Sequence, residues 1–207
     1  MRRLDRRLRA LARRVENEAA RWRDEPIRRV AVASKVMRPV RVAQFGSFGA
    51  LSIVQRPMWL YGAQHISIGD NVIILRGSWL AVERRAWDRD EPTLRIGNRV
   101  AIRTNCTMSA SESIVIEDDV GMGGYVTVID SKHTWLPGNP NVLAAPVEAA
   151  PVRIGKGTWL ADRAAVAAGA DIGEQCAIGP NTVVSSKVPD FSIVLGNPGR
   201  VVGSTRV

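Results

Sequence analysis

The 207-residue sequence predicts a mainly β protein whose main domain is a parallel β-helix, with a basic α-helix before it and one long loop within it. Three observations predict this architecture. Aliphatic residues recur at every sixth position, small residues follow four positions later, and one proline-rich segment interrupts the repeat. A period of six fits neither an α-helix, which repeats every 3.6 residues, nor an ordinary strand, which repeats every two. It fits a coil of three such segments that form the sides of a triangular prism.

Residues 1–26 form the predicted N-terminal amphipathic helix, which Pro26 ends. The apolar residues of this segment are three or four positions apart, which leaves the arginines on the other face. They are Leu4, Leu8, Leu11, Val15, Ala19 and Trp22. Two locations remain open for this helix: it lies on an acidic membrane surface, or it packs against its own domain or a neighbouring subunit of the trimer discussed below.

The net charge of +9 belongs to the N-terminal part of the chain: residues 1–41 contain 14 Lys/Arg and 5 Asp/Glu, whereas residues 42–207 contain 15 of each. Because the main domain has no net charge, we expect no nucleic-acid partner. No apolar stretch reaches the ~18–20 residues that span a bilayer, and the arginine-rich start lacks the apolar region of a secretory signal. We expect a cytoplasmic protein, with a peripheral contact at the inner face of the membrane as one role for residues 1–26.

Residues 27–65 are a transitional segment without a sharp prediction, and the repeat domain occupies residues 66–207. The inward aliphatic positions are Ile68, Ile74, Leu80, Ile96, Ile102, Met108, Ile114, Ile116, Met122, Val128, Ile154, Leu160, Val166, Ile172, Ile178 and Val184. Both cysteines, Cys106 and Cys176, fall on the small inward positions of the repeat. We therefore expect them to pack in the core as free thiols.

Three departures from the period are expected to be loops or bulges at coil corners. Two are short: the excursion over residues 83–93, and two extra residues between Ile114 and Ile116. The largest is a protruding loop over residues 130–152, whose prolines prevent it from continuing a β coil. Long loops on a regular scaffold are usually functional.

Three stretches resemble the hexapeptide-repeat acyltransferases, in the branch that acetylates maltose, galactosides and xenobiotics. They are TNCTM at 104–108, VTVIDSKH at 126–133, and PVRIGKGTW at 151–159 followed by GNPGR at 196–200. The resemblance extends over roughly residues 66–202. It implies a left-handed β-helix, a homotrimer, and transfer of an acetyl group from acetyl-CoA to a hydroxyl acceptor such as a sugar or glycan, with no metal required.

On the acceptor side, the resemblance implies that His133 is the general base and that Asn105 binds the acceptor. Asp130, three residues before His133, is expected either to orient the imidazole or to bind an acceptor hydroxyl. An imidazole titrating near ~6.5 suits proton removal at neutral pH. Many relatives have D-H-x-H where residues 130–133 read D-S-K-H, and sugar acetyltransferases often have an aspartate where this chain has Ala110. A simple maltose or galactoside acceptor is therefore less expected.

On the cosubstrate side, the family holds coenzyme A between neighbouring prisms of the trimer. The resemblance implies that its binding residues here are Trp159, Ala161, Gly179, Ser185 and Arg200. A prism-shaped carbonic anhydrase needs three histidines around its metal, and the chain has two in total. The alternative function that stays open is a non-catalytic trimeric scaffold built on the same repeat.

Overall fold

A computed structural model of the chain describes residues 36–55, 59–134, 138, 141 and 145–206. The chain divides into two compact units, residues 1–38 and 39–207. Of the first unit only residues 36–38 are described, and they are part of a helical stretch over residues 36–44. The amphipathic helix predicted for residues 1–26 lies outside the described residues.

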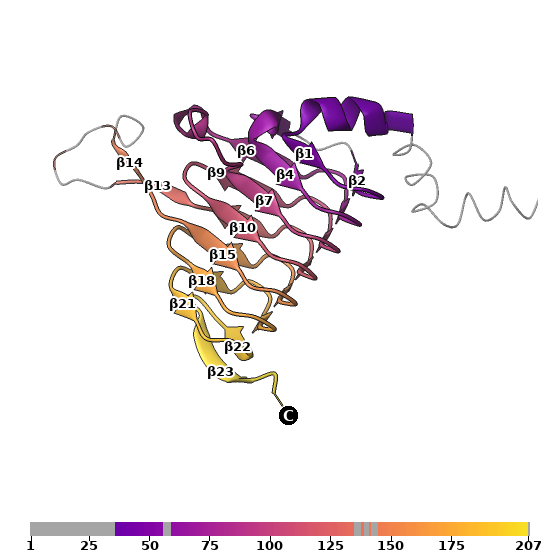
Figure 1. The fold of residues 1–207 in the computed structure, drawn as a ribbon. Helices are drawn as coiled ribbons and strands as arrows, with labels where there is room; N and C mark the ends of the chain where they lie inside the picture. The colour runs from indigo at the N-terminus through magenta and orange to yellow at the C-terminus, as the bar shows by residue number, and fades with distance from the viewer. Residues whose placement is uncertain (1–35, 56–58, 135–137, 139–140, 142–144, 207) are drawn as a thin grey trace, which may run out of the picture. The chain divides into compact units, whose positions relative to one another are not determined.

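The second unit coils through three parallel sheets, which we name faces A, B and C (Figure 1). Face A contains β1 (Ser47–Phe48), β4 (Ile66–Ile68), β7 (Leu94–Ile96), β10 (Ile114–Ile116), β15 (Val152–Ile154), β18 (Asp171–Ile172) and β21 (Lys187–Val188). Face B contains β2 (Ile53–Val54), β5 (Ile73–Ile74), β8 (Ala101–Ile102), β11 (Gly121–Met122), β16 (Trp159–Leu160), β19 (Ala177–Ile178), β22 (Ser192–Leu195) and β23 (Arg200–Ser204). Face C contains β3 (Trp59–Tyr61), β6 (Trp79–Val82), β9 (Thr107–Ala110), β12 (Thr127–Ile129), β17 (Ala165–Val166) and β20 (Val183–Val184).

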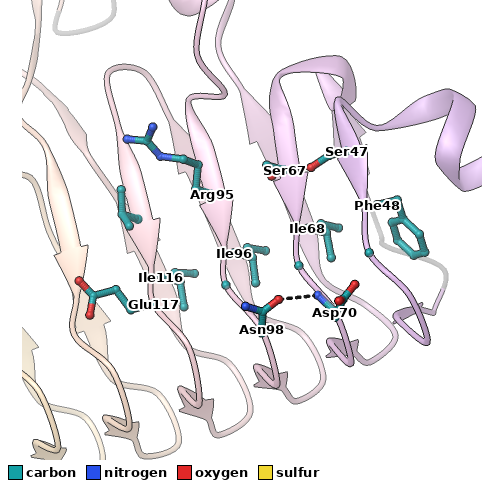
Figure 2. Close-up of a pocket in the computed structure, with 14 residues that line it drawn as sticks. Ser47, Phe48, Ser67, Ile68, Asp70, Arg95, Ile96, Asn98, Ile116 and Glu117 are labelled. Carbon is teal, nitrogen blue, oxygen red and sulfur yellow. Dashed lines mark hydrogen bonds between the residues drawn. The ribbon is translucent and has the colours of Figure 1, made fainter.

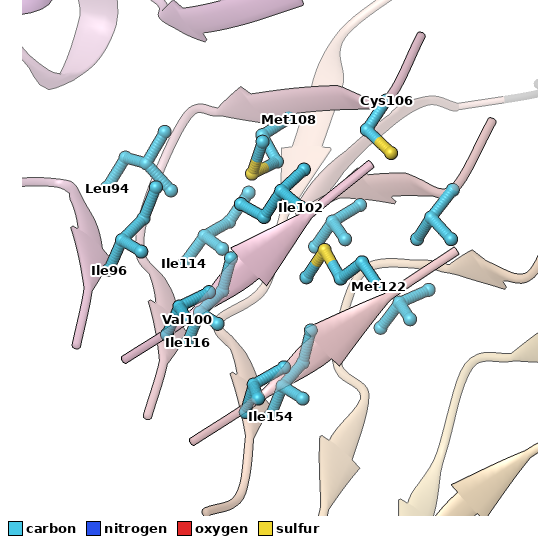
Figure 3. Close-up of a cluster of buried hydrophobic side chains, with 14 of the residues drawn as sticks. Leu94, Ile96, Val100, Ile102, Cys106, Met108, Ile114, Ile116, Met122 and Ile154 are labelled. Carbon is cyan, nitrogen blue, oxygen red and sulfur yellow. The ribbon is translucent and has the colours of Figure 1, made fainter. Parts of the chain in front are cut away.

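The hexad pattern is confirmed, because every predicted inward aliphatic residue is at most 3% exposed. These side chains stack between the faces into one continuous core, part of which Figure 3 shows from Leu94 to Ile154. Coils pair in register: Ile116, for example, lies between Ile96 and Ile154. The coiling also begins earlier than the predicted start at residue 66, since β1, β2 and β3 form a first coil within residues 47–61.

The backbone conformation at the corners of the coil explains why each hexad has a small residue four positions after its aliphatic residue. The residue directly before the small residue has a left-handed backbone, with φ of 56° at Asn71, 60° at Asn105 and 54° at Asn181. Asparagine tolerates this conformation better than most residues with a side chain. The chain turns there and the next side chain points into the narrow corner of the prism, where Cys106 is 1% exposed. Only a small or β-branched side chain fits that space.

The three departures from the period stack on one corner, between the end of face C and the start of face A, which we call the CA corner. The excursion after β6 contains the short 3-10 helix η2 (Arg84–Ala86). One coil earlier, at the same corner, η1 (Ala63–His65) connects β3 to β4. The two extra residues are accommodated in the next coil, over residues 111–113, and β10 itself has no bulge. The predicted loop over 130–152 contains an antiparallel hairpin of β13 (Ser131–His133) and β14 (Val147–Ala149), which projects from the prism (Figure 1).

The last strand closes the repeat. β23 turns back after Gly199 and pairs antiparallel with β22 at the C-terminal end of face B. In the described part of the chain, no helix is long and apolar enough to cross a membrane.

Candidate functional site

His133 lies on the hairpin at the CA corner, and its backbone partner on β14 is Val147. Backbone hydrogen bonds on either side of this pair join Ala150 N to Asp130 O at 2.8 Å and Thr134 N to Pro146 O at 2.9 Å. Hydrogen-bonded pairs alternate along an antiparallel ladder, so His133 and Val147 form a non-hydrogen-bonded pair. The backbone N–H and C=O of Val147 therefore point away from β13.

The His133 side chain is exposed, while the start of its strand is held by the prism. Side chains alternate along a strand, so His133 shares its face of the hairpin with Ser131, whereas Lys132 points to the other face and pairs with Glu148 at 3.6 Å. The imidazole is thus accessible, yet His133 lies only four positions after Ile129 in face C.

Asp130 has a structural role that differs from the predicted acceptor-binding one. Its side chain is fully buried. One carboxylate oxygen accepts the backbone N–H of Ser111 at 2.7 Å, and the other accepts those of Glu112 and Ser113, both at 2.8 Å. The carboxylate is therefore committed to residues 111–113, the segment of the neighbouring coil that accommodates its two extra residues, and has no free surface to offer an acceptor.

Sequence reasoning missed a group of hydroxyls beside the hairpin. Ser111 donates a hydrogen bond from its Oγ to Ser131 Oγ at 3.2 Å. Ser109, on the neighbouring strand of face C, has its Oγ 3.5 Å from Glu83 Oε1. A signal was present in the alternation S-A-S-E-S over residues 109–113, which places Ser109 outward on β9. These groups surround the base of the hairpin rather than its tip.

Asn105 is exposed but does not meet His133 within one chain. It is a corner residue before β9, and its backbone N–H donates to Arg76 O at 3.1 Å. His133 follows β12, the neighbouring strand of the same face. Asn105 thus stands at the edge of face C next to face B, whereas His133 lies beyond its other edge, at the CA corner.

Four of the five predicted coenzyme A residues follow the other edge of face C, where it meets face B. Ala161 and Gly179 come directly after β16 and β19, two strands paired in register. A Cβ on Gly179 would contact Leu195, which is the strand partner of Arg200. Trp159 lies outward on β16 and is about half exposed (46%).

The Trp159 indole covers the backbone of Gly121, its partner on the neighbouring strand β11. A Cβ at Gly121 would lie 2.6 Å from the ring. Ser185, the fifth predicted residue, is exposed and stands apart from the other four, beyond the end of β20 toward the CA corner.

A shallow hollow of about 520 Å³ lies elsewhere, on face A and its edge toward face B (Figure 2). None of the predicted site residues lines it. Its polar groups hold the coils together: Asp70 N donates to Asn98 Oδ1 at 2.9 Å, and Glu117 pairs with Arg153 at 2.9 Å. The polar groups of the hollow are therefore used to stabilise the stacked coils.

The two cysteines are buried, as the repeat predicts. Burial raises the pKa of both thiols, which keeps them protonated near neutral pH. Cys106 Sγ lies 3.2 Å from Gly123 O, and Cys176 Sγ lies 3.2 Å from Pro189 O. Neither thiol is placed to act as a nucleophile. Within the described residues, no group of three or more His, Cys, Asp or Glu side chains could hold a metal ion.

The chain is similar in sequence to proteins named as acetyltransferases. The Mycobacterium tuberculosis protein named "Probable acetyltransferase Rv3034c" is 29% identical over 127 residues, which are 61% of this chain and 42% of that protein. The Escherichia coli protein WbbJ, whose name assigns it to lipopolysaccharide biosynthesis O-acetyl transfer, is 23% identical over 157 residues, or 72% of this chain and 77% of its own length. No protein-family profile matches the chain.

Two solved structures share the coiled architecture. A variant of AntD, an N-acyltransferase from Bacillus cereus, was solved with dTDP and coenzyme A; it superposes with a TM-score of 0.69 at 18% identity, covering 82% of this chain and 89% of its own. A hexapeptide-repeat containing acetyltransferase from Vibrio cholerae, solved with acetyl coenzyme A, gives 0.55 at 20% identity and covers 88% and 89%. The chain is thus similar in sequence to proteins named as acetyltransferases, and it shares its fold with solved acyltransferases, one of them titled as containing hexapeptide repeats.

The structural likeness confirms the fold predicted from the repeat, a left-handed parallel β-helix. The chain spans less than half the length of the Mycobacterium tuberculosis relative. The names of these similar proteins include both O-acetyl transfer, in WbbJ, and N-acyl transfer, in AntD.

Proposed function

We propose that the chain is a coenzyme A-dependent acyltransferase that moves an acetyl group from acetyl-CoA to a hydroxyl of a sugar or glycan, with His133 as the general base. The acceptor oxygen attacks the thioester carbonyl carbon as His133 takes its proton. The carbon–sulfur bond then breaks, and the proton passes to the departing thiolate. The products are the acetyl ester and free coenzyme A.

The place of His133 carries this proposal. A general base must reach a substrate and yet be held in position. His133 is exposed on a hairpin whose start, Asp130, is buried and bound to the neighbouring coil by three hydrogen bonds. The other histidine, His65, stacks on Trp87 with ring centroids 5.7 Å apart, which makes it a packing residue.

For the cosubstrate, we propose the edge between faces B and C near the C-terminal end. Small residues at Ala161 and Gly179 keep the backbone accessible there, and Trp159 supplies an exposed flat surface. The exposed guanidinium of Arg200 is suited to a phosphate, and Ser185 extends the site along face C. The solved proteins with this fold that contain coenzyme A or acetyl coenzyme A support the assignment.

We also propose that the active unit is a homotrimer, because one chain does not bring its two sets of site residues together. Charge on the faces supports self-association. Outward strand residues of face A include Arg95, Arg153, Asp171 and Lys187, whereas no outward strand residue of faces B or C described from β2 to β22 is charged. Ala165→Glu on face C should dissociate the trimer in analytical ultracentrifugation, while Val115→Glu on face A, the matched control, should not.

The sequence of residues 1–26 supports a separate proposal on location: its basic amphipathic pattern binds an anionic membrane surface at the cytoplasmic side. Binding to liposomes with and without phosphatidylglycerol, before and after removal of residues 1–26, tests it. Unchanged liposome binding after the deletion would contradict it.

The function is tested by thiol release from acetyl-CoA with a panel of sugars, nucleotide sugars and amines. His133→Ala should lower kcat by about 10²–10⁴-fold, the usual contribution of a general base. Lys132→Ala is the matched control, since Lys132 occupies the other face of the same hairpin. If His133→Ala retains the full rate with an active acceptor, the mechanism is wrong. If no acceptor releases thiol, the result favours the non-catalytic scaffold.

A further inference from the structure

The excursion over residues 83–93 reaches the hairpin that carries His133. Arg85, in η2, donates a hydrogen bond from Nη1 to the backbone oxygen of Val147 at 3.0 Å, across 62 positions of sequence. Val147 is the residue that stands opposite His133 in the hairpin. Two departures from the six-residue period, two coils apart, are thus joined at the strand partner of the proposed general base.

The hydrogen-bond pattern of the hairpin leaves the Val147 carbonyl available to Arg85. Because His133 and Val147 form a non-hydrogen-bonded pair, the Val147 carbonyl points to the outer edge of β14 and finds no partner on β13. In a wider sheet a third strand would bind this edge. Among the described residues the sheet of the hairpin has two strands, and Arg85 takes the place of a third strand at this position.

The excursion is itself firmly attached to the prism. Ala86, beside Arg85, is fully buried. Trp87 donates from Nε1 to Val82 O at 3.0 Å and stacks on His65 at 5.7 Å. The backbone that carries Arg85 therefore belongs to the rigid body, and the long side chain extends from it to the hairpin.

A two-stranded hairpin is at best marginally stable by itself, so its contacts with the prism decide where its residues lie. Asp130 holds the start of β13 from the interior. We infer that Arg85 is a positioning residue that holds β14 from the outside and so sets the location of His133. This inference rests on the proposed function of His133 for its catalytic consequence, although the contact itself does not depend on it.

The first experiment needs no activity. Arg85→Met keeps most of the stem and removes the donors, and Arg89→Met changes another exposed arginine of the same excursion as the matched control. Hydrogen exchange of the Thr134 and Ala150 amides, which bond within the hairpin and at its base, should become about fivefold faster in Arg85→Met. The Ala165 amide of face C should not change in either variant. Equal exchange in the two arginine variants would overturn the inference.

The second experiment asks whether the contact positions His133. The chain has two histidines, so the imidazole signals of His133 and His65 can be assigned in ¹⁵N spectra with His133→Ala. In Arg85→Met the His133 signals should narrow toward those of a mobile side chain, and kcat for thiol release should fall about fivefold with KM for acetyl-CoA unchanged. Arg85→Lys, which keeps a donor, should recover part of both effects.

The outcomes separate the two ideas. If His133→Ala is fully active but Arg85→Met still loosens the hairpin, the proposed function fails and the contact remains. If exchange accelerates in Arg85→Met while the His133 signals and kcat stay the same, Arg85 is structural only and its positioning role is refuted.

Discussion

Asp130 offers the sharpest test of how the prism supports the hairpin. Asp130→Ala removes a buried carboxylate and leaves three backbone N–H groups, those of residues 111–113, without their acceptor. A hydrogen bond to a charged group contributes about 1.5–3 kcal/mol, and a buried donor without a partner costs about 1–3 kcal/mol. Because the three donors share one acceptor, these contributions do not simply add.

We expect a loss of about 3–5 kcal/mol in the free energy of unfolding, a large part of the ~5–15 kcal/mol that stabilises a typical domain. Asp130→Asn should cost less, because its amide oxygen still accepts while its NH₂ group faces a donor. Urea denaturation followed by circular dichroism measures both. Asp162→Ala is the control: Asp162 is exposed and accepts one backbone N–H, from Gly124, so its loss should stay near ~1 kcal/mol or below.

Hydrogen exchange shows which parts of the chain the Asp130→Ala substitution destabilises. In Asp130→Ala the amides of residues 111–113 should lose protection together with the hairpin, while coils further along the prism keep theirs, because neighbouring repeats contact only each other. A cost below ~1 kcal/mol for Asp130→Ala would refute the structural role. Such a result would return Asp130 to the roles predicted from the sequence, orienting the imidazole or binding an acceptor hydroxyl.

Three further predictions follow from single contacts. Gly121→Val should displace the Trp159 indole, since the added Cβ would lie 2.6 Å from it; KM for acetyl-CoA should rise in a thiol-release assay, and an unchanged KM would remove Trp159 from the cosubstrate site. Ile116→Ala should lower the free energy of unfolding by about 2–5 kcal/mol by leaving a cavity in the core, measured by urea denaturation; a smaller loss would mean that the coils close over the space. The backbone and side-chain N–H groups of Asn98 lower the pKa of Asp118 from its ordinary value of 3.8, so the contribution of the carboxylate to stability is complete above 3.8 and is lost as pH falls through the lowered pKa. Asp118→Asn should therefore show a shallower fall in Tm between about pH 4 and 2 than the wild type. Equal slopes in the two proteins would contradict this prediction.

The regular part of the fold was predictable because it repeats. Six consecutive hexads from Ile154 to Val184 specify three-sided coils with almost no alternative, and the burial of every inward position agrees. The first coil, over residues 47–61, was not predicted because its signal is weaker. Its inward residues include Phe48 and Val54, and this coil follows soon after the helical stretch over residues 36–44, with no earlier coil before it in the described residues.

The candidate site was predictable in part. His133 stands out in the sequence as a histidine between a regular coil and a proline-rich loop, and the structure places it exposed on the projecting hairpin. The role of Asp130 could not be deduced from the sequence, because a carboxylate three residues before a histidine can equally orient the imidazole, bind an acceptor or bind backbone N–H groups of another coil. The N–H groups that bind it belong to residues 111–113, and no local pattern connects the two segments.

By itself the sequence determined the coil, its inward residues and the position of the long interruption, since each depends on spacing along the chain. Only the tertiary structure decided that three separate irregularities meet at one corner, where Asp130 and Arg85 hold the hairpin from two sides. It also separated Asn105 and His133 to opposite edges of face C. The physical reason is the same in both cases: the pitch of the coil brings residues about 20 positions apart into contact, and insertions in different coils become neighbours only when the prism is built.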